Sequence, residues 1–314
     1  MRNESNLDIL QDQLEELLRK EADKVKGLPL ALSGGVDSSL LAALAEPRYV
    51  VSVGLPVGKH NETDYSKKVA DHLGIEQIII YPDDDKFDNY FEKAVRAIGR
   101  PIPHFNIFPL YCMYEYLSSR GELALVLGDG PDETMCGYGR NLIMEYLYRI
   151  YNFDAFETYK PTIDKVLPNF LESYLKVLGK EDAVLPNLEG LSRDQIMCRL
   201  DMDLMRPDMD DMSNKIAESF GITNIRPYQD NQEVDNFMYE LPLEAKIHGV
   251  EYGKYLLRRI AEKYLPKEIA WRKAKVGGPV FNVNIFKGWD KTDGEFGKKT
   301  YLEKQQKILN NDYN

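Results

Sequence analysis

The segment from Leu28 to Leu40 constrains the fold of this chain most strongly. It begins as a short apolar run, passes through Ser33, Gly34 and Gly35, and continues as a stretch typical of a helix that begins near Asp37. Adjacent glycines let the backbone turn tightly with no side chain in the way, and the first amides of a helix attract anions. The pattern therefore predicts a strand, a phosphate-binding loop and a helix.

Polar side chains surround the same turn. Ser33, Ser38 and Ser39 supply hydroxyl donors, whereas Asp37 is an acid at a place where a bare phosphate would repel it. Mg²⁺ takes oxygen ligands and usually binds through one or two carboxylates plus phosphate oxygens. We therefore expect Asp37 to share Mg²⁺ with a polyphosphate. The alternative is an ordinary glycine-rich turn between a strand and a helix.

The spacing Ser-Gly-Gly-x-Asp-Ser resembles the signature of the PP-loop ATP pyrophosphatases, which cleave ATP between its α and β phosphates. The Gly-Lys-Ser/Thr ending of a Walker loop is absent from this segment. The resemblance implies that ATP is the nucleotide and that the loop holds the released pyrophosphate.

A second motif follows the apolar run at residues 123–127, which is short enough for a buried parallel strand. The chain then reads Gly-Asp-Gly-Pro-Asp-Glu from Gly128, beyond the carboxyl end of a strand, where open α/β sheets bind ligands. This stretch resembles the Ser-Gly-Asp/Glu-Gly-x-Asp-Glu-Leu-Phe-Gly-Gly-Tyr motif of the synthetase domain of asparagine synthetases. Leu127 stands where that family has Ser, and Cys136 where it has the first of two paired glycines.

The resemblance implies different roles for two acidic residues of this loop. It implies that Asp132 joins Asp37 in holding Mg²⁺, and that Asp129 lies beside the activated carboxylate and assists the incoming amine. The related β-lactam synthetases carry a Tyr at the Asp129 position, so a carboxylate here favours intermolecular amidation over ring closure. Taken alone, the acids of such a loop are also explained as caps of the next helix.

A third resemblance, over residues 241–272, is to the Lys-Tyr-Leu-Leu-Arg segment of the same family and the Leu-Pro that follows it. It points to Lys254, because a preorganised ammonium stabilises the negative charge that grows on departing pyrophosphate. Lys246, Arg258 and Arg259 are better explained as solvated or paired side chains.

Arg226 lies in a segment similar to the family's Arg-Val-Pro-Phe-Leu-Asp, shortened by one residue. Its guanidinium suits a substrate carboxylate or a phosphate, and it suits a structural ion pair equally well. The family's Arg-x-Lys-x-Gly-Phe appears here from Arg272 to Gly278 with an extra residue and no Phe, and we expect this loop to close over the nucleotide.

By resemblance, the backbone at Val53 meets adenine, and Leu32 and Gly128 line the base and ribose. Plain sheet packing explains Val53 and Leu32 as well. The full set expected to contact ATP or pyrophosphate is Leu32, Ser33, Gly34, Gly35, Asp37, Ser38, Ser39, Val53, Gly128 and Lys254.

The order of apolar runs and helix-like segments predicts an α/β fold. Its core is a PP-loop (adenine nucleotide alpha hydrolase-like) parallel sheet flanked by helices, and its C-terminal half is mostly helical. We expect the active site in the cleft between the two. The expected divisions are a packing helix at 1–27, an ATP-binding core at 28–150, a helical substrate half at 151–284 and a polar, mobile tail at 285–314.

The function implied by the resemblance is ATP-dependent amide formation. A substrate carboxylate, by default aspartate, attacks MgATP to release pyrophosphate, and ammonia or an amine then displaces AMP. The alternatives are an amide synthetase acting on a sugar acid, peptide or natural-product carboxylate, and a non-catalytic nucleotide-binding subunit. NAD synthetases are disfavoured by the loop from Gly128 to Tyr138, and sulfur-inserting tRNA enzymes by the absence of paired cysteines.

The composition of the chain limits the kinds of partner that we expect it to bind. The net charge of −11 argues against a nucleic-acid substrate, and no apolar run reaches the ~18 residues of a membrane span. Cys112, Cys136 and Cys198 include no close pair in sequence, which indicates neither a disulfide framework nor a zinc site, and we expect a cytoplasmic enzyme. No glutaminase domain precedes the PP-loop, so we expect free ammonia, an amine or a separate glutaminase subunit as the nitrogen source; a homodimer is left open.

Overall fold

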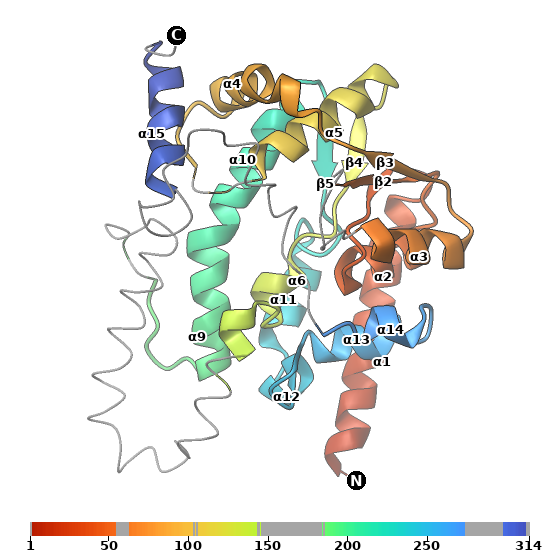
Figure 1. The fold of residues 1–314 in the computed structure, drawn as a ribbon. Coiled ribbons are helices and arrows are strands. Elements are labelled where there is room, and N and C mark those ends of the chain that lie inside the picture. The colour runs from red at the N-terminus through yellow and green to blue at the C-terminus, as the bar shows by residue number, and fades with distance from the viewer. Residues whose placement is uncertain are drawn as a thin grey trace.

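A parallel sheet organises the residues that the computed structural model describes, which are 2–54, 63–102, 104, 106–142, 145, 184, 186–273 and 298–311. Residues 151–183 of the expected helical half, 274–278 of the expected nucleotide loop and 285–297 of the expected tail lie outside them. Within the described residues the sheet has five strands in the order β3-β2-β1-β4-β5, all pairs parallel (Figure 1). The strands are β1 (Leu30–Ala31), β2 (Val50–Val53), β3 (Gln77–Ile80), β4 (Ala124–Val126) and β5 (Thr223–Ile225).

The sheet is covered on both faces, which explains its short apolar strands. Val50 and Val126 contribute to one hydrophobic cluster, whereas their neighbours Val51 and Leu125 contribute to the other. Successive side chains of a strand point to opposite faces, so these pairs mark the two sides of the sheet. Parallel strands buried on both faces read as continuous apolar runs, as these do.

Different helices cover the two faces. The helices of the first cluster are α1 (Arg2–Lys24), α2 (Val36–Ala45), α3 (Thr63–Leu73), α11 (Gln232–Glu240), α12 (Leu243–Lys246), α13 (Tyr255–Ala261) and α14 (Lys267–Ala270). Those of the second are α4 (Phe87–Ile98), α5 (Ile107–Ser119), α10 (Arg206–Glu218) and α15 (Lys298–Leu309). The remaining described elements are η1 (Asp84–Lys86), α6 (Pro131–Thr134), α9 (Arg193–Leu200), the π-helical turn η2 (Asp201–Met205), β6 (Ile247–His248) and β7 (Tyr252–Gly253).

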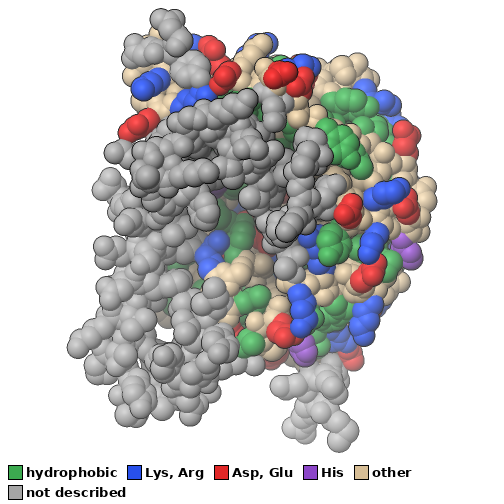
Figure 2. Space-filling view, in the orientation of Figure 1, with side chains coloured by type: hydrophobic (Ala, Val, Ile, Leu, Met, Phe, Trp, Pro, Cys, Tyr) green, Lys and Arg blue, Asp and Glu red, His purple; other side chains and the backbone are tan. Residues whose placement is uncertain are grey.

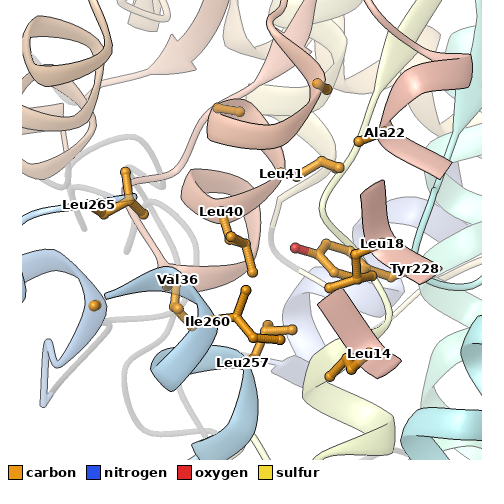
Figure 3. Close-up of a cluster of buried hydrophobic side chains, with 14 of the residues drawn as sticks. Leu14, Leu18, Ala22, Val36, Leu40, Leu41, Tyr228, Leu257, Ile260 and Leu265 are labelled. Atoms are coloured by element: carbon orange, nitrogen blue, oxygen red, sulfur yellow. The ribbon is translucent and has the colours of Figure 1, made fainter. Parts of the chain in front are cut away.

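The N-terminal helix α1 packs on α2 and α13. Figure 3 shows Leu14 and Leu18 of α1 meeting Leu40 of α2 and Ile260 of α13 in one buried cluster, with the ring of Tyr228 beside Leu18. The helix therefore connects the start of the sheet to the segment that begins after Lys254.

Two features differ from the expected divisions of the chain. Strand β5 follows residue 150, yet it pairs with β4 in the central sheet, so the sheet draws on both expected halves. In the expected mobile tail, α15 packs on α4 (Figure 1). Tyr301 and Ile308 of this helix are buried. Gln305 of the same helix accepts a hydrogen bond from the Ile102 amide at 2.9 Å, because its buried amide side chain needs partners.

The described surface mixes both signs of charge. On the face drawn in Figure 2, acidic and basic side chains intermingle over the described residues. Among those residues, no helix combines the length and apolar character needed to cross a membrane.

Candidate active site

The sheet places two loops side by side. The strand order reverses between β1 and β4, so the loops that follow these strands leave the same edge of the sheet next to each other. Such a switch point is where open parallel sheets bind ligands. Contact is close, because a Cβ added to Gly128 would lie 2.9 Å from the backbone nitrogen of Ser38.

The first loop is held in shape by its own serines. The Ser33 amide donates to Ser38 Oγ at 3.1 Å, the two hydroxyl oxygens are 3.0 Å apart, and the Gly35 amide donates to Ser33 Oγ at 3.3 Å. Gly34 has a φ of +73°, and a Cβ there would lie 2.6 Å from the Ser66 amide nitrogen. The loop thus requires glycine at this position for both its conformation and its packing.

The N-terminus of α2 has the properties expected of an anion site. Gly35 caps the helix without any side-chain hydrogen bond, so the first amides keep their donors available to a ligand. The Ser39 hydroxyl is completely buried and has no hydrogen-bond partner among the described residues. A buried hydroxyl without a partner is costly, and a phosphate oxygen would satisfy it.

Lys254 joins the two loops. Its Nζ lies 2.5 Å from Asp37 Oδ2 of the first loop and 2.5 Å from Asp132 Oδ1 of the second. Burial lowers the pKa of Lys254, but Asp132 and Asp37 outweigh burial and hold that pKa above its ordinary value. The three residues predicted from three separate motifs therefore form one cluster with a charged, buried ammonium at its centre.

The backbone around Lys254 is strained and tightly packed. Lys254 has a φ of 57° and Cys136 a φ of 53°, both in the left-handed region that glycine adopts most easily. The Lys254 amide donates to the carbonyl of Met135 at 3.0 Å. A Cβ on Gly137 would lie 2.1 Å from Lys254 Cε and 2.2 Å from Asp132 Oδ1, so glycine is required there.

The carboxylates of Asp37 and Asp132 fit a magnesium ion. Two carboxylates that converge on one ammonium leave a net negative charge, which opposes the entry of a polyphosphate. Mg²⁺ commonly binds through one or two carboxylates and phosphate oxygens, and this donor set matches that pattern. These two residues would hold the ion.

Glu133 stands in the second motif, where the sequence pattern predicts no role for it. Burial, and then the charge of Asp132, raise the pKa of Glu133 to about 8. Tyr138 donates a short hydrogen bond to Glu133 Oε1. A carboxyl group protonated near neutral pH beside Asp132 is a candidate proton donor or acceptor. Its signal in the sequence was only its adjacency to Asp132.

Asp129 and Arg226 lie together on the other side of the second loop. Asp129 is 57% exposed, and its Oδ2 is 3.5 Å from Arg226 Nε, whereas Arg226 itself is buried. The same guanidinium lies 3.4 Å from Asp210 and donates to Ser213 Oγ at 2.7 Å and to Asn214 Oδ1 at 2.9 Å. These contacts favour the ion-pair interpretation of Arg226, with Asp129 as the exposed member.

The nucleotide side of the expected site lies at neighbouring strand ends. Leu32 donates from its amide to the carbonyl of Val51 at 2.8 Å, and its own carbonyl accepts from Ser52 Oγ at 2.7 Å. Val53, the last residue of β2, is partly exposed, and Leu32 is buried. Both positions are compatible with a wall for the base and with plain sheet packing.

The weaker basic candidates are occupied elsewhere. Lys246 donates to Asp194 at 3.0 Å, Arg258 to the carbonyls of Gly253 and Ala270, and Arg259 to Asp8.

Arg272 belongs to the motif that diverges from the family's pattern, and the sequence predicts no separate role for it. Its guanidinium lies 3.6 Å from the centre of the Tyr65 ring and 3.4 Å from the carbonyl of Gly34, which places a cation beside the phosphate loop.

The phosphate loop and the acidic loop at adjacent parallel strands define an α/β PP-loop-type synthetase domain. The family model described as asparagine synthase matches residues 10–292, so the chain belongs to that family. A putative glutamine-hydrolyzing asparagine synthetase of Methanocaldococcus jannaschii is 27% identical over 271 residues, 80% of this chain and 46% of that protein. Asparagine synthetase B of Escherichia coli, also named glutamine-hydrolyzing, is 22% identical over 290 residues, 84% of this chain and 43% of that protein.

A fungal relative carries a different name. The protein named amidase chry2 of Gibberella zeae is 24% identical over 148 residues, 40% of this chain and 22% of that protein. The chain spans less than half the length of the relatives compared here.

Proposed function

We propose that this protein is an ATP-dependent amide ligase that forms AMP. A substrate carboxylate attacks the α-phosphorus of ATP and pyrophosphate leaves; ammonia or an amine then attacks the acyl-adenylate, and AMP leaves. The observation that carries the proposal is the ammonium of Lys254, 2.5 Å from both Asp37 and Asp132, beside an uncapped helix N-terminus. Each part is suited to polyphosphate chemistry.

The first step rests on residues of the two loops. The amides at the start of α2 and the Ser39 hydroxyl donate to phosphate oxygens, and Lys254 stabilises the charge that grows on departing pyrophosphate. Mg²⁺ held by Asp37 and Asp132 would offset the repulsion between the carboxylate and the polyphosphate. Leu32, Val53 and Gly128 border the position proposed for the nucleoside.

The second step rests on the pair of Asp129 and Arg226. An incoming ammonium must lose protons before its nitrogen can form an amide, and an exposed carboxylate is a suitable acceptor. Arg226 fixes the carboxylate from the buried side without covering it. We assign the substrate carboxylate to the space beside Asp129.

Aspartate is the proposed acceptor, since relatives are named asparagine synthetases. A second candidate is the same reaction on another carboxylate, such as a sugar acid, a peptide or a natural product; the relative named amidase chry2 is not named for asparagine. We propose ammonia, an amine or ammonia from a glutaminase as the nitrogen source, a cytoplasmic location and no nucleic-acid partner.

The test is product analysis. Purified protein, MgATP and ammonium are incubated with aspartate or with other carboxylic acids one at a time, and AMP, pyrophosphate and amide are measured. Pyrophosphate release that depends on one acid, with the matching amide by mass spectrometry, supports the proposal. Formation of ADP and phosphate, or nucleotide binding without turnover across the acids and amines, contradicts it and favours a nucleotide-binding subunit.

A further inference from the structure

Two buried thiols meet beside the active-site loop. Cys136 lies in the second loop and Cys198 lies on α9, 62 residues later, yet their sulfur atoms are only 3.6 Å apart. Both side chains are completely buried. Sequence spacing indicated no pair, because the two residues are distant along the chain and come together only in the fold.

The surroundings favour a thiolate at Cys198. Lys246 Nζ lies 4.0 Å from Cys198 Sγ and is the cation that can stabilise a thiolate there. The Thr134 carbonyl, 3.2 Å from the same sulfur, accepts a hydrogen bond only from the protonated thiol. A hydrogen bond from Cys136, together with the charge of Lys246, lowers the pKa of Cys198 in spite of burial. The thiolate is the nucleophilic form of cysteine, so Cys198 is suited to attack and Cys136 to resolve.

The residues on either side of Cys136 contact Lys254 directly. The carbonyl of Met135, its neighbour, accepts the Lys254 amide hydrogen bond at 3.0 Å. Its other neighbour, Gly137, packs directly against Lys254 Cε and Asp132. The Cys136 carbonyl oxygen would lie 2.1 Å from a Cβ on Gly253, so the segment has no free space on that side. A displacement of Cys136 therefore shifts the groups that hold the ammonium.

We propose that Cys136 and Cys198 form a reversible disulfide with a small peroxide as oxidant, and that this bond lowers the activity at Lys254. The Cys198 thiol releases its proton, the thiolate attacks one peroxide oxygen, and the O–O bond breaks. Sulfenic acid forms, and the departing hydroxide takes up the released proton to give water. The Cys136 thiol then attacks the sulfenic sulfur, the S–S bond forms and a second water leaves. Two thiols and one hydrogen peroxide thus give one disulfide and two waters.

Formation of the disulfide between Cys136 and Cys198 requires the two sulfur atoms to move closer together. The sulfur atoms lie 3.6 Å apart and must approach by about 1.5 Å to reach a bond length of about 2.05 Å. Cys198 lies on a helix, whereas Cys136 lies in a loop that already has a left-handed backbone, so we expect the loop to move. A misplacement of about 1 Å in a catalytic group can reduce a rate by about 100-fold, and we expect a loss of about 10- to 100-fold.

The burial of both thiols favours a small oxidant over a large one. Both thiols are fully covered, so a small neutral peroxide reaches them more readily than a bulky disulfide such as oxidised glutathione. The third cysteine, Cys112, is buried in the other hydrophobic cluster, where burial raises the pKa of its thiol to about 12. Cys112 is therefore a matched control with low reactivity.

The experiment treats the reduced protein with hydrogen peroxide and maps its disulfides by mass spectrometry. The expected result is a peptide containing Cys136 linked to Cys198, removed by dithiothreitol, in the parent and in Cys112→Ser. Cys198→Ser keeps its activity under reducing conditions and loses the sensitivity to peroxide. Oxidised glutathione at equal concentration gives little of the crosslink.

The mapping does not depend on any substrate, whereas the activity measurement rests on the proposed function. Failure to form the crosslink while Cys136 and Cys198 stay reduced, or are oxidised separately, overturns the proposal. A crosslink that forms with nucleotide binding and pyrophosphate release unchanged overturns the regulatory part. If the crosslink forms but the protein releases no pyrophosphate with any acid, the proposed function is contradicted. In that case nucleotide affinity is measured before and after oxidation, and an unchanged affinity overturns the regulatory part.

Discussion

Tyr228 donates a hydrogen bond of 2.9 Å from its hydroxyl to the backbone carbonyl of Asp37, 191 residues earlier in the chain. Tyr228 is completely buried and follows β5, whereas Asp37 lies in the first turn of α2. The bond therefore connects the segment after the fifth strand to the phosphate loop, so the position of Asp37 depends on a distant part of the chain.

Removing this hydrogen bond should destabilise the protein modestly. Tyr228→Phe keeps the buried ring and deletes one donor, so we expect the free energy of unfolding to fall by about 0.5–1.5 kcal/mol. Urea unfolding followed by circular dichroism measures it. Tyr81→Phe, at a side chain that is 51% exposed, is the matched control with no expected change. Equal unfolding midpoints for the two variants would show that the bond contributes nothing.

Removing the ammonium of Lys254 should abolish most of the chemistry. In Lys254→Met the buried stem is retained, but Asp37 and Asp132 face each other without a cation. We expect pyrophosphate release to fall by about 100- to 1,000-fold, the range seen when one preorganised donor is lost from a transition-state site. Lys267→Met is the control, since that side chain is 80% exposed. A variant at Lys254 that retains the parent rate would remove Lys254 from the mechanism.

Local patterns accounted for the first part of the fold. The strands around Leu30, Val51 and Leu125 are short apolar runs followed by glycine, and each of these signals lies within a few residues of its strand. The convergence of Asp37, Asp132 and Lys254 was also predicted, because each residue stood in a motif whose order along the chain matched a known family. Candidate functional residues that lie in contiguous motifs can therefore be identified from the sequence alone.

Contacts between distant segments were not predictable in the same way. The pairing of β5 with β4, the burial of Tyr301 and the approach of Cys136 to Cys198 depend on how helices pack, not on any local pattern. Glu133 is a related case. Its residue type was visible, but its raised pKa comes from burial under neighbouring elements, and burial is a property of the folded chain.

Asp129→Asn should separate the two proposed steps. The substitution keeps the shape of the side chain beside Arg226 and removes the proton acceptor. We expect substrate-dependent exchange of pyrophosphate into ATP to continue, while amide formation falls by about 100- to 10,000-fold, the usual contribution of a general base. Asp71→Asn, an exposed aspartate on α3, should leave both rates unchanged. Equal losses in exchange and amide formation would assign Asp129 to the first step instead.

Gly137→Ala should disturb the ion cluster through a single methyl group. The added carbon would lie 2.1 Å from Lys254 Cε, 2.2 Å from Asp132 Oδ1 and 2.9 Å from the Asp132 backbone, so both charged side chains must shift. Because a shift of about 1 Å can reduce a rate by about 100-fold, we expect a loss of that order in pyrophosphate release. Gly139→Ala is a matched control, since nothing lies within 4 Å of its added carbon. Similar rates for the two variants would contradict the tight packing described here.

Glu133 should make stability depend on pH. Burial, and then the charge of Asp132, raise its pKa from the ordinary 4.5 to about 8. The folded state therefore keeps a proton that the unfolded state releases, so this contribution is full below pH 4.5 and is lost as the pH rises through 8.

Glu133→Gln retains the hydrogen-bonding shape toward Tyr138 but does not titrate. We expect the variant and the parent to have similar melting temperatures near pH 5 and to diverge toward about pH 9, with the parent less stable, by about 2–4 °C for each kcal/mol lost. Thermal unfolding across this pH range measures the difference. Glu16→Gln, at a side chain that is 71% exposed, should follow the parent at every pH. Parallel curves for the parent and Glu133→Gln would mean that Glu133 is already ionised at neutral pH, because the positive charge of Arg206 would then outweigh the burial of the carboxyl group.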